Sequence, residues 1–140
     1  MDKRHQPAQT DDRPKIVIID DEADFLTMME RSLKPLYRVT ALYGSEWTYA
    51  QIAEIEPDLV LLDVHMPEQG GFELCRELRA DPRFARLPII FLTCSRTDED
   101  FRRHLSAGGT RFLNKVIDRR HLLAAIAEEL AAASAVRCAR

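Results

Sequence analysis

The sequence predicts a single α/β domain in which a doubly wound parallel sheet carries helices on both faces. Short apolar runs without alternation recur along the chain, which is typical of strands buried on both sides. Segments with apolar residues at helical spacing lie between these runs. Because crossover connections between parallel strands are right-handed, this alternation leads to helices on both faces of one sheet.

Five strands and five helices follow from this pattern. The apolar runs predict strands over residues 15–20, 37–42, 58–63, 87–93 and 110–115. Helical spacing predicts helices over residues 22–33, 45–56, 71–80, 97–109 and 118–134. Ser45 and Thr97 are the expected N-caps of the second and fourth helices. Residues 1–14 are polar without periodicity and are expected to form a flexible arm, residues 15–134 form the domain, and residues 135–140 are expected to fray.

Composition narrows the class of protein. A chain of 140 residues with 46% hydrophobic and 31% charged residues suits one globular domain. The net charge of -3 argues against non-specific nucleic-acid binding. No apolar run approaches the roughly 18 residues of a membrane span. Cys75, Cys94 and Cys138 form neither a disulfide framework nor a zinc spacing, which favours a reducing cytoplasm.

Polar side chains end four of the five predicted strands. They are Asp20-Asp21, Asp63, Thr93 and Lys115. Because the carboxyl ends of parallel strands meet at one edge of a sheet, these groups are expected to lie together. Three carboxylates at close range repel one another, and a hard divalent cation such as Mg²⁺ would relieve that repulsion.

This combination is typical of a phosphoryl-handling site. Two carboxylates would hold the metal while the third attacks phosphorus and forms an acyl phosphate. A single aspartate after a strand is more often a turn or helix cap, and Asp20 or Asp21 alone would serve the helix beginning at residue 22. Lys115 alone would be read as a surface lysine. The conjunction of all these groups at matching strand ends favours the functional reading.

These residues resemble the receiver domains of two-component response regulators. The resemblance covers residues 15–134 and depends on the motifs "IVIIDDEADF", "PDLVLLDVHMPEQGGFEL", "LPIIFLT" and "GGTRFLNK" in that order. It implies a flavodoxin-like fold with five parallel strands in the order 2-1-3-4-5 and five helices.

The resemblance also implies the chemistry of the site. Asp63 matches the phosphoacceptor, and Mg²⁺ would be bound by Asp20, Asp21, Asp63 and the backbone carbonyl of His65, with Asp20 acting largely through water. Lys115 would pair with a phosphoryl oxygen.

A conformational switch is implied as well. Thr93 would turn its hydroxyl toward the phosphoryl group, and Phe112 would move inward with it. In the family this change reshapes the face formed by helix 4, strand 5 and helix 5, which controls a downstream protein.

The resemblance therefore predicts a phosphorylation-activated signalling switch rather than an enzyme beyond self-phosphorylation and autodephosphorylation. The donor would be a histidine kinase or a histidine phosphotransfer protein, with no nucleic-acid or membrane partner and with a homodimer left open. We expect a stand-alone, cytoplasmic protein, although the sequence also suits one part of a longer chain.

Two other functions are compatible with parts of the sequence. The first is a phosphorylation-independent pseudo-receiver that binds proteins. Val116 favours it because the family usually has a proline after the lysine, and Cys94 does so because a smaller residue usually follows the threonine. We expect a trans Lys115–Val116 bond, or a strained cis one, and a shifted loop. The second is a metal-dependent phosphatase with an aspartyl nucleophile, in which His65 would replace the usual acid-base aspartate.

Overall fold

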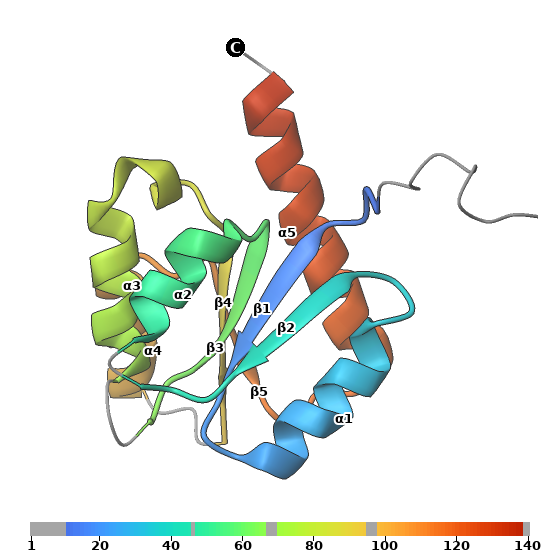
Figure 1. The fold of residues 1–140 in the computed structure, drawn as a ribbon. Coiled ribbons are helices and arrows are strands. Elements are labelled where there is room, and N and C mark those ends of the chain that lie inside the picture. Colours follow the sequence, from blue (N-terminus) through green and yellow to red (C-terminus); the bar gives the residue numbers. More distant parts are fainter. Residues whose placement is uncertain (1–10, 46, 67–69, 95–97, 139–140) are drawn as a thin grey trace, which may run out of the picture.

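A five-stranded parallel sheet forms the centre of the molecule (Figure 1). The computed structural model describes residues 11–45, 47–66, 70–94 and 98–138. The strands are β1 (Lys15–Ile19), β2 (Arg38–Leu42), β3 (Leu59–Asp63), β4 (Ile89–Thr93) and β5 (Arg111–Asn114). Their order in the sheet is β2-β1-β3-β4-β5, and all four neighbouring pairs are parallel. The predicted order 2-1-3-4-5 is confirmed.

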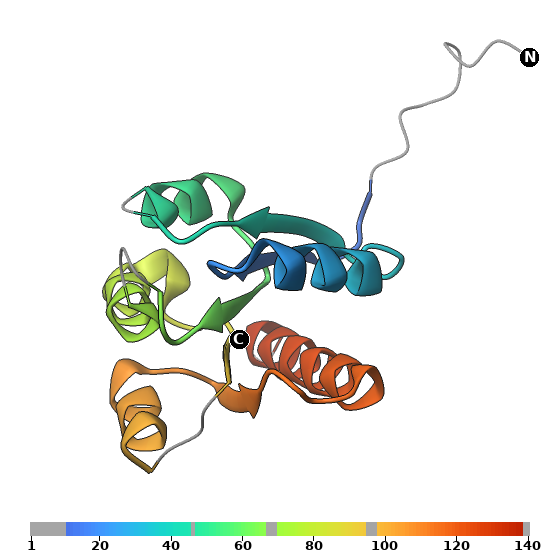
Figure 2. The same cartoon turned by 90° about the horizontal axis from the view of Figure 1, so that it is seen from below.

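Helices cover both faces of the sheet. They are α1 (Ala23–Leu33), α2 (Thr48–Ile55), α3 (Gly71–Ala80), α4 (Asp98–Ala107) and α5 (Arg119–Cys138), with a short 3₁₀ helix η2 (Pro82–Phe84) after α3. The view along the sheet in Figure 2 places α1 and α5 on one side, and α2, α3 and α4 on the other. This arrangement is the predicted doubly wound fold.

The core consists of two apolar clusters, one on each face of the sheet. Alternate residues of β1 and β3 point to opposite clusters, so that Val17 and Val60 pack with α2 and α3 while Ile18 and Leu61 pack with α1 and α5. Every residue of β3 and β4 is buried. Burial on both faces explains why these strands are continuous apolar runs in the sequence.

The beginning of α2 differs from the prediction. The helix begins at Thr48 rather than at Ser45, and its N-cap residue Trp47 makes no side-chain cap. Ser45 instead forms a turn, in which its hydroxyl accepts from the Trp47 N–H and its own N–H donates to the Thr48 hydroxyl. The predicted Ser45 cap is therefore wrong, because the side chain satisfies a turn. The predicted Thr97 cap lies outside the described residues.

Both ends of the domain have contacts or structure that the sequence pattern did not give. In the described part of the arm, Arg13 donates to the Lys34 carbonyl at 2.8 Å, and its own carbonyl accepts from the Arg38 guanidinium at 2.6 Å. Helix α5 continues to Cys138, past the predicted helix end at residue 134. Residues 1–10 and 139–140 lie outside the described part of the chain.

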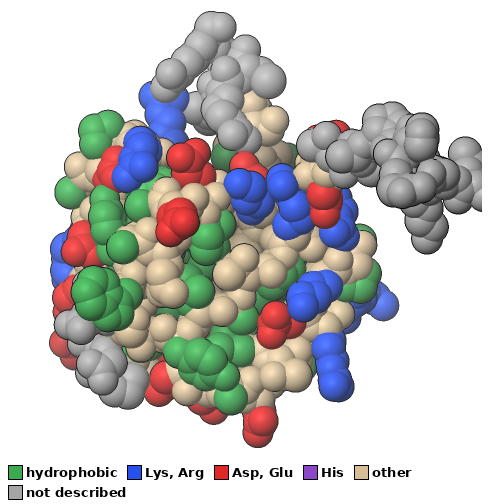
Figure 3. All heavy atoms as spheres, viewed as in Figure 1, with side chains coloured by type: hydrophobic (Ala, Val, Ile, Leu, Met, Phe, Trp, Pro, Cys, Tyr) green, Lys and Arg blue, Asp and Glu red, His purple; other side chains and the backbone are tan. Residues whose placement is uncertain are grey.

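Charged side chains of both signs are mixed on the surface. On the face that Figure 3 shows, red and blue side chains of the described residues are interspersed with apolar ones. Within the described ranges, no helix combines the length and the hydropathy that crossing a bilayer requires.

Candidate functional site

Three carboxylates converge at the carboxyl end of the sheet. Asp20 and Asp21 directly follow β1, and Asp63 is the last residue of β3. The two strands are neighbours, with Ile19 opposite Leu62, so their ends are brought side by side. One oxygen from each carboxylate lies within 4.8 Å of the others. Asp20 and Asp63 are only 1% and 6% exposed, while Asp21 is exposed.

Burial and mutual repulsion raise the pKa of two carboxyl groups in this cluster. Desolvation, followed by the negative charge of Asp20, raises the pKa of Asp63 from 3.8 to about 7. The pKa of Asp20 is also raised, mainly because the carboxylate is buried, although hydrogen bonding to Lys115 works in the opposite direction. Both carboxylates would therefore gain from a cation that favours their charged form.

Lys115 is the ammonium group closest to the cluster among the described residues. Its Nζ lies 2.7 Å from Asp20 Oδ2, 2.8 Å from Glu22 Oε1 and 3.9 Å from Asp63 Oδ1. The same Nζ lies 4.6 Å from the centre of the Phe25 ring. Burial alone would lower the pKa of Lys115, but hydrogen bonds to Asp20 and Glu22 and the charge of Asp63 raise it overall. The lysine is therefore charged, and it reaches from the end of β5 to Asp20 after β1 and toward Asp63 of β3.

The donor set fits a magnesium ion. Carboxylate oxygens are the ligands that Mg²⁺ prefers, and the three groups lie within the span that one ion bridges. Burial raises the pKa of both Asp20 and Asp63, so a bound cation would favour their charged form. Asp20, Asp21 and Asp63 are the groups that would hold it, and the ligand expected from the His65 carbonyl stays a prediction.

The start of α3 lies close to the end of β3. The Gly71 N–H donates to the Val64 carbonyl at 3.0 Å. A Cβ at Gly71 would collide with the main-chain carbonyl of Asp63. Glycine is therefore required where α3 approaches the aspartate this closely.

Thr93 lies on β4, the strand next to β3, and Phe112 lies on β5, the strand beyond it. Thr93 ends β4 and is 1% exposed, and Phe112 in β5 is 5% exposed. Phe112 pairs with Phe91 of the neighbouring β4, and its ring contacts those of Phe101 and His104 on α4. The structure thus brings Thr93 to the edge that carries the carboxylates. It places Phe112 on the neighbouring strand, where its ring packs against α4.

Comparison with known proteins identifies the family. The family model for the response regulator receiver domain matches residues 16–127. The chain belongs to this family. Its members are signalling domains of two-component systems, and the predicted membership is confirmed.

Individual relatives agree with this assignment. The chain is 36% identical over 104 residues to protein RcaC of Microchaete diplosiphon, which covers 74% of this chain but only 16% of that relative. The chain thus spans about a sixth of its relative's length.

Two solved receiver domains show the same fold. One belongs to a signal transduction histidine kinase of Syntrophus aciditrophicus, with 26% identity, a TM-score of 0.78 and coverage of 85% of this chain and 91% of that one. The other is the BeF3-activated N-terminal receiver domain of Klebsiella pneumoniae RstA, with 29% identity, a TM-score of 0.73 and coverage of 83% and 97%.

The two residues of this receiver domain that depart from the family's usual pattern, Val116 and Cys94, are both exposed. The described chain contains no cis peptide bond, so Lys115–Val116 is trans, as the sequence favours. Val116 is 86% exposed, and its N–H donates to Asn114 Oδ1 at 2.9 Å. Lys115 still reaches the carboxylates. Cys94 is exposed.

Two acidic residues near the site were not identified from the sequence. Glu22 is a partner of Lys115, and its place directly after Asp20-Asp21 in an acidic run was the available signal. Asp100 on α4 is 8% exposed, and its Oδ2 lies 3.4 Å from Nε2 of His65. Nothing in the sequence indicates this contact, because it joins residues that are 35 positions apart.

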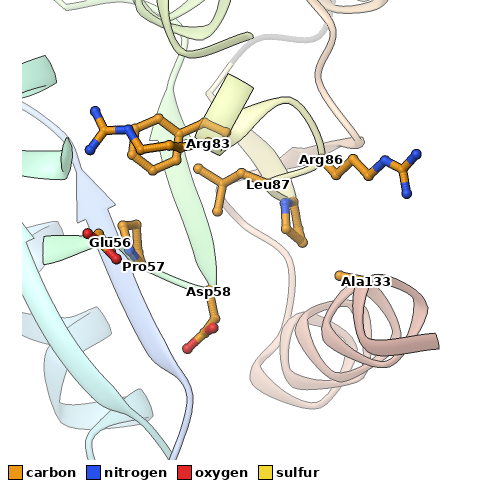
Figure 4. Close-up of a pocket in the computed structure, with 9 residues that line it drawn as sticks. Glu56, Pro57, Asp58, Arg83, Arg86, Leu87 and Ala133 are labelled. Atoms are coloured by element: carbon orange, nitrogen blue, oxygen red, sulfur yellow. The ribbon is translucent and has the colours of Figure 1, made fainter. Parts of the chain in front are cut away.

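A hollow lies at the end of the sheet opposite the carboxylates, between α5 and the turn after η2 (Figure 4). It has a volume of about 350 Å³. Arg83 and Arg86 point away from each other, and the Asp58 carboxylate accepts the Lys15 N–H at 2.8 Å. Because these charged groups do not converge, we do not assign this hollow a chemical role.

Proposed function

We propose that this chain is a phosphorylation-activated switch that accepts a phosphoryl group on Asp63 from a phosphohistidine donor. The donor is a histidine kinase or a histidine phosphotransfer protein. The observation that carries the proposal is the convergence of Asp20, Asp21 and Asp63 with Lys115 at one edge of the sheet. Membership of the receiver family supports it.

The transfer is a displacement at phosphorus. A carboxylate oxygen of Asp63 forms the new P–O bond while the P–N bond to the donor imidazole breaks, and the electron pair stays on that nitrogen, which takes up a proton. The raised pKa of Asp63 means that part of the population is protonated near neutral pH, and a protonated carboxyl is a poor nucleophile. When bound, Mg²⁺ supplies positive charge for the carboxylates and for the phosphoryl oxygens.

The chain's own residues then stabilise the product. A phosphoryl group adds about -1.5 to -2 charge, which needs a fixed cation beside it. Lys115 is 3.9 Å from Asp63, close enough to move onto a phosphoryl oxygen. Thr93 donates its hydroxyl from the end of β4, and Phe112 changes position with it.

The output surface that we propose is formed by α4, β5 and α5. On α4, Phe101 and Leu105 are one turn apart and are 44% and 59% exposed. On the neighbouring elements, Arg111 of β5 forms ion pairs with Glu128 and Glu129 of α5, at 3.0 and 2.9 Å. An apolar patch beside a charged one is suited to binding a downstream protein or a second copy of the chain.

Other parts of the proposal concern the whole protein. We propose a receiver domain over residues 15–134 that acts in the cytoplasm. The phosphorylation-independent module is the weaker alternative, because the acidic cluster and its lysine are complete. A phosphatase is disfavoured because the chain belongs to the receiver family, whose members are signalling domains.

The test is phosphorylation by phosphoramidate, which carries the same kind of P–N bond as phosphohistidine. With Mg²⁺ present, intact-mass spectrometry should detect one added phosphoryl group on the wild type and none on Asp63→Asn. Asp58→Asn, at the other end of β3, is the matched control and should be labelled normally. Equal labelling of Asp63→Asn and the wild type would overturn the assignment of the site.

A further inference from the structure

His104 occupies an unusual position on α4. Its side chain points into the core and is 4% exposed, whereas Phe101 and Leu105 on the same helix are exposed. The imidazole lies among three aromatic rings, with centroid distances of 5.6 Å to Phe91 of β4, 5.4 Å to Phe112 of β5 and 5.8 Å to Phe101 of α4. The interplanar angle with Phe112 is 31°, so the two rings are tilted against each other.

The imidazole is buried without full hydrogen bonding. Its Nδ1 is buried and, within the described residues, has no hydrogen-bond partner. Such a group costs about 1–3 kcal/mol relative to a solvated one. Burial also lowers the pKa of His104, so the ring is neutral at physiological pH.

The charged groups around His104 do not compensate a proton on its ring. On α4, Asp100 lies one turn earlier and contacts His65. From α3, Arg79 donates to the Gly108 and Phe84 carbonyls, and the Cys75 thiol donates to the Ala107 carbonyl. Strands β4 and β5 contribute only the two aromatic rings to the contacts of His104.

Gly109 provides the space for this ring. The residue follows α4, and its N–H donates to the His104 carbonyl at 3.2 Å. A Cβ at position 109 would collide with His104 Nδ1 and with the Phe91 ring. His104 and Gly109 are therefore a coupled pair, in which the imidazole fills the volume that an alanine methyl group would need.

We propose that His104 is a positioning residue that couples α4 to Phe112 and makes the switch sensitive to pH. In the resting state the neutral imidazole is wedged between α4 and the aromatic rings of β4 and β5. The inward movement of Phe112 toward Thr93 takes its ring away from His104 and uncovers the imidazole. Movement of Phe112 and protonation of His104 therefore favour the same displaced arrangement of α4.

The proposal rests on the proposed function, because it needs Phe112 to move when Asp63 is phosphorylated. The sign of the linkage follows from the burial. The resting state keeps the pKa of His104 below its ordinary value near 6.5, and uncovering the ring raises it toward that value. The activated state then binds more protons in this interval, so lower pH favours activation. Above about pH 7 both states are neutral and the effect disappears.

The experiment is an NMR titration of the His104 ring in the full chain, without and with Mg²⁺ and beryllofluoride. Resonances are assigned with His104→Phe, which preserves an aromatic ring of similar size and removes the titrating nitrogen. We expect the pKa of His104 to rise by at least about 0.5 unit on activation, which corresponds to an effect of about threefold on the equilibrium. A pKa that stays the same or falls would overturn the inference, provided that the Asp63-dependent shifts and the movement of Phe112 are seen.

Two further measurements separate this role from simple packing. In His104→Phe, the activation equilibrium should lose its His104-dependent change between about pH 7 and pH 5.5. Gly109→Ala should destabilise the His104→Ala background less than the wild type, because the collision with His104 is removed and the one with the Phe91 ring remains. Equal destabilisation in both backgrounds would contradict the coupled pair. If beryllofluoride leaves the spectrum unchanged, the proposed function itself fails and the inference falls with it.

Discussion

The two aspartates that bracket β3 have the same side chain in opposite surroundings. Asp58, just before the strand, is half-buried, and its carboxylate accepts the Lys15 N–H at 2.8 Å while its own N–H donates to the Lys15 carbonyl. Asp63, at the other end, is 6% exposed and lies beside two further carboxylates. Its closest ammonium group, Lys115, is 3.9 Å away and already binds Asp20 and Glu22.

The difference separates stabilising charge from functional charge. Asp58 forms a local cap that joins β1 to β3, and folding alone satisfies it. Asp63 is placed where folding leaves repulsion unrelieved, so that a cation and a phosphoryl group can change its state. One strand therefore carries a structural aspartate at its amino end and, in the proposed function, the phosphoacceptor at its carboxyl end.

The largest expected effect concerns metal binding. Asp21→Asn removes one charged ligand from an exposed position, so we expect the Mg²⁺ dissociation constant to rise by about 100-fold, or about 2.7 kcal/mol. Isothermal titration calorimetry measures the constant directly. Asp58→Asn should leave it unchanged. An Asp21→Asn affinity equal to that of the wild type would show that the ion, if it binds, does not use this cluster.

The next effect is a gain in folding stability when the charge of Asp63 is removed. Without Mg²⁺, Asp63→Asn should raise the unfolding free energy by about 1–3 kcal/mol at pH 8, because a repelled buried charge is removed. The folded-state pKa of Asp63 lies near 7, above the unfolded value near 3.8. The folded state therefore binds more protons between these values, and the wild type loses stability as pH rises through this interval.

The pH profile and the matched variant check this explanation. In urea unfolding, the gain of Asp63→Asn should be largest at pH 8 and should shrink as pH falls from 7 toward 4. Asp58→Asn keeps an oxygen that accepts the Lys15 N–H, so its stability should stay within about 0.5 kcal/mol of the wild type. A gain for Asp63→Asn that is the same at both pH values would mean that ionisation of Asp63 is not its cause.

The fold was predictable because the sheet is buried on both faces. Each strand of the centre is an apolar run, and the polar residue that ends it is visible in the sequence at once. Asp63 and Lys115 are 52 positions apart, yet parallel strands bring their ends to one edge. The positions of the site's main residues therefore follow from strand order alone.

Features that depend on individual side-chain contacts were not predictable in this way. Ser45 reads as a helix cap, but its hydroxyl satisfies a turn instead. His104 reads as one more polar residue on a charged helix, and its burial depends on space left by Gly109 five positions later. The Glu22 side chain is exposed, and it contacts Lys115 because both side chains are long enough to reach each other. Pattern arguments give the backbone's arrangement, and these contacts lie beyond it.

The smallest expected effect tests how Lys115 is shared at the reactive end. Glu22 Oε1 lies 2.8 Å from Lys115 Nζ but its side chain is 60% exposed, so the pair contributes at most about 1 kcal/mol. Glu22→Gln weakens this competitor for the ammonium group. Beryllofluoride should then bind about two- to fivefold more tightly in the presence of Mg²⁺, because less interaction energy is lost when Lys115 turns to the bound anion. Glu30→Gln, which removes another ion pair of α1 with a lysine, is the matched control and should have no effect. Weaker binding by Glu22→Gln would mean instead that Glu22 holds Lys115 in the position that the phosphoryl group needs.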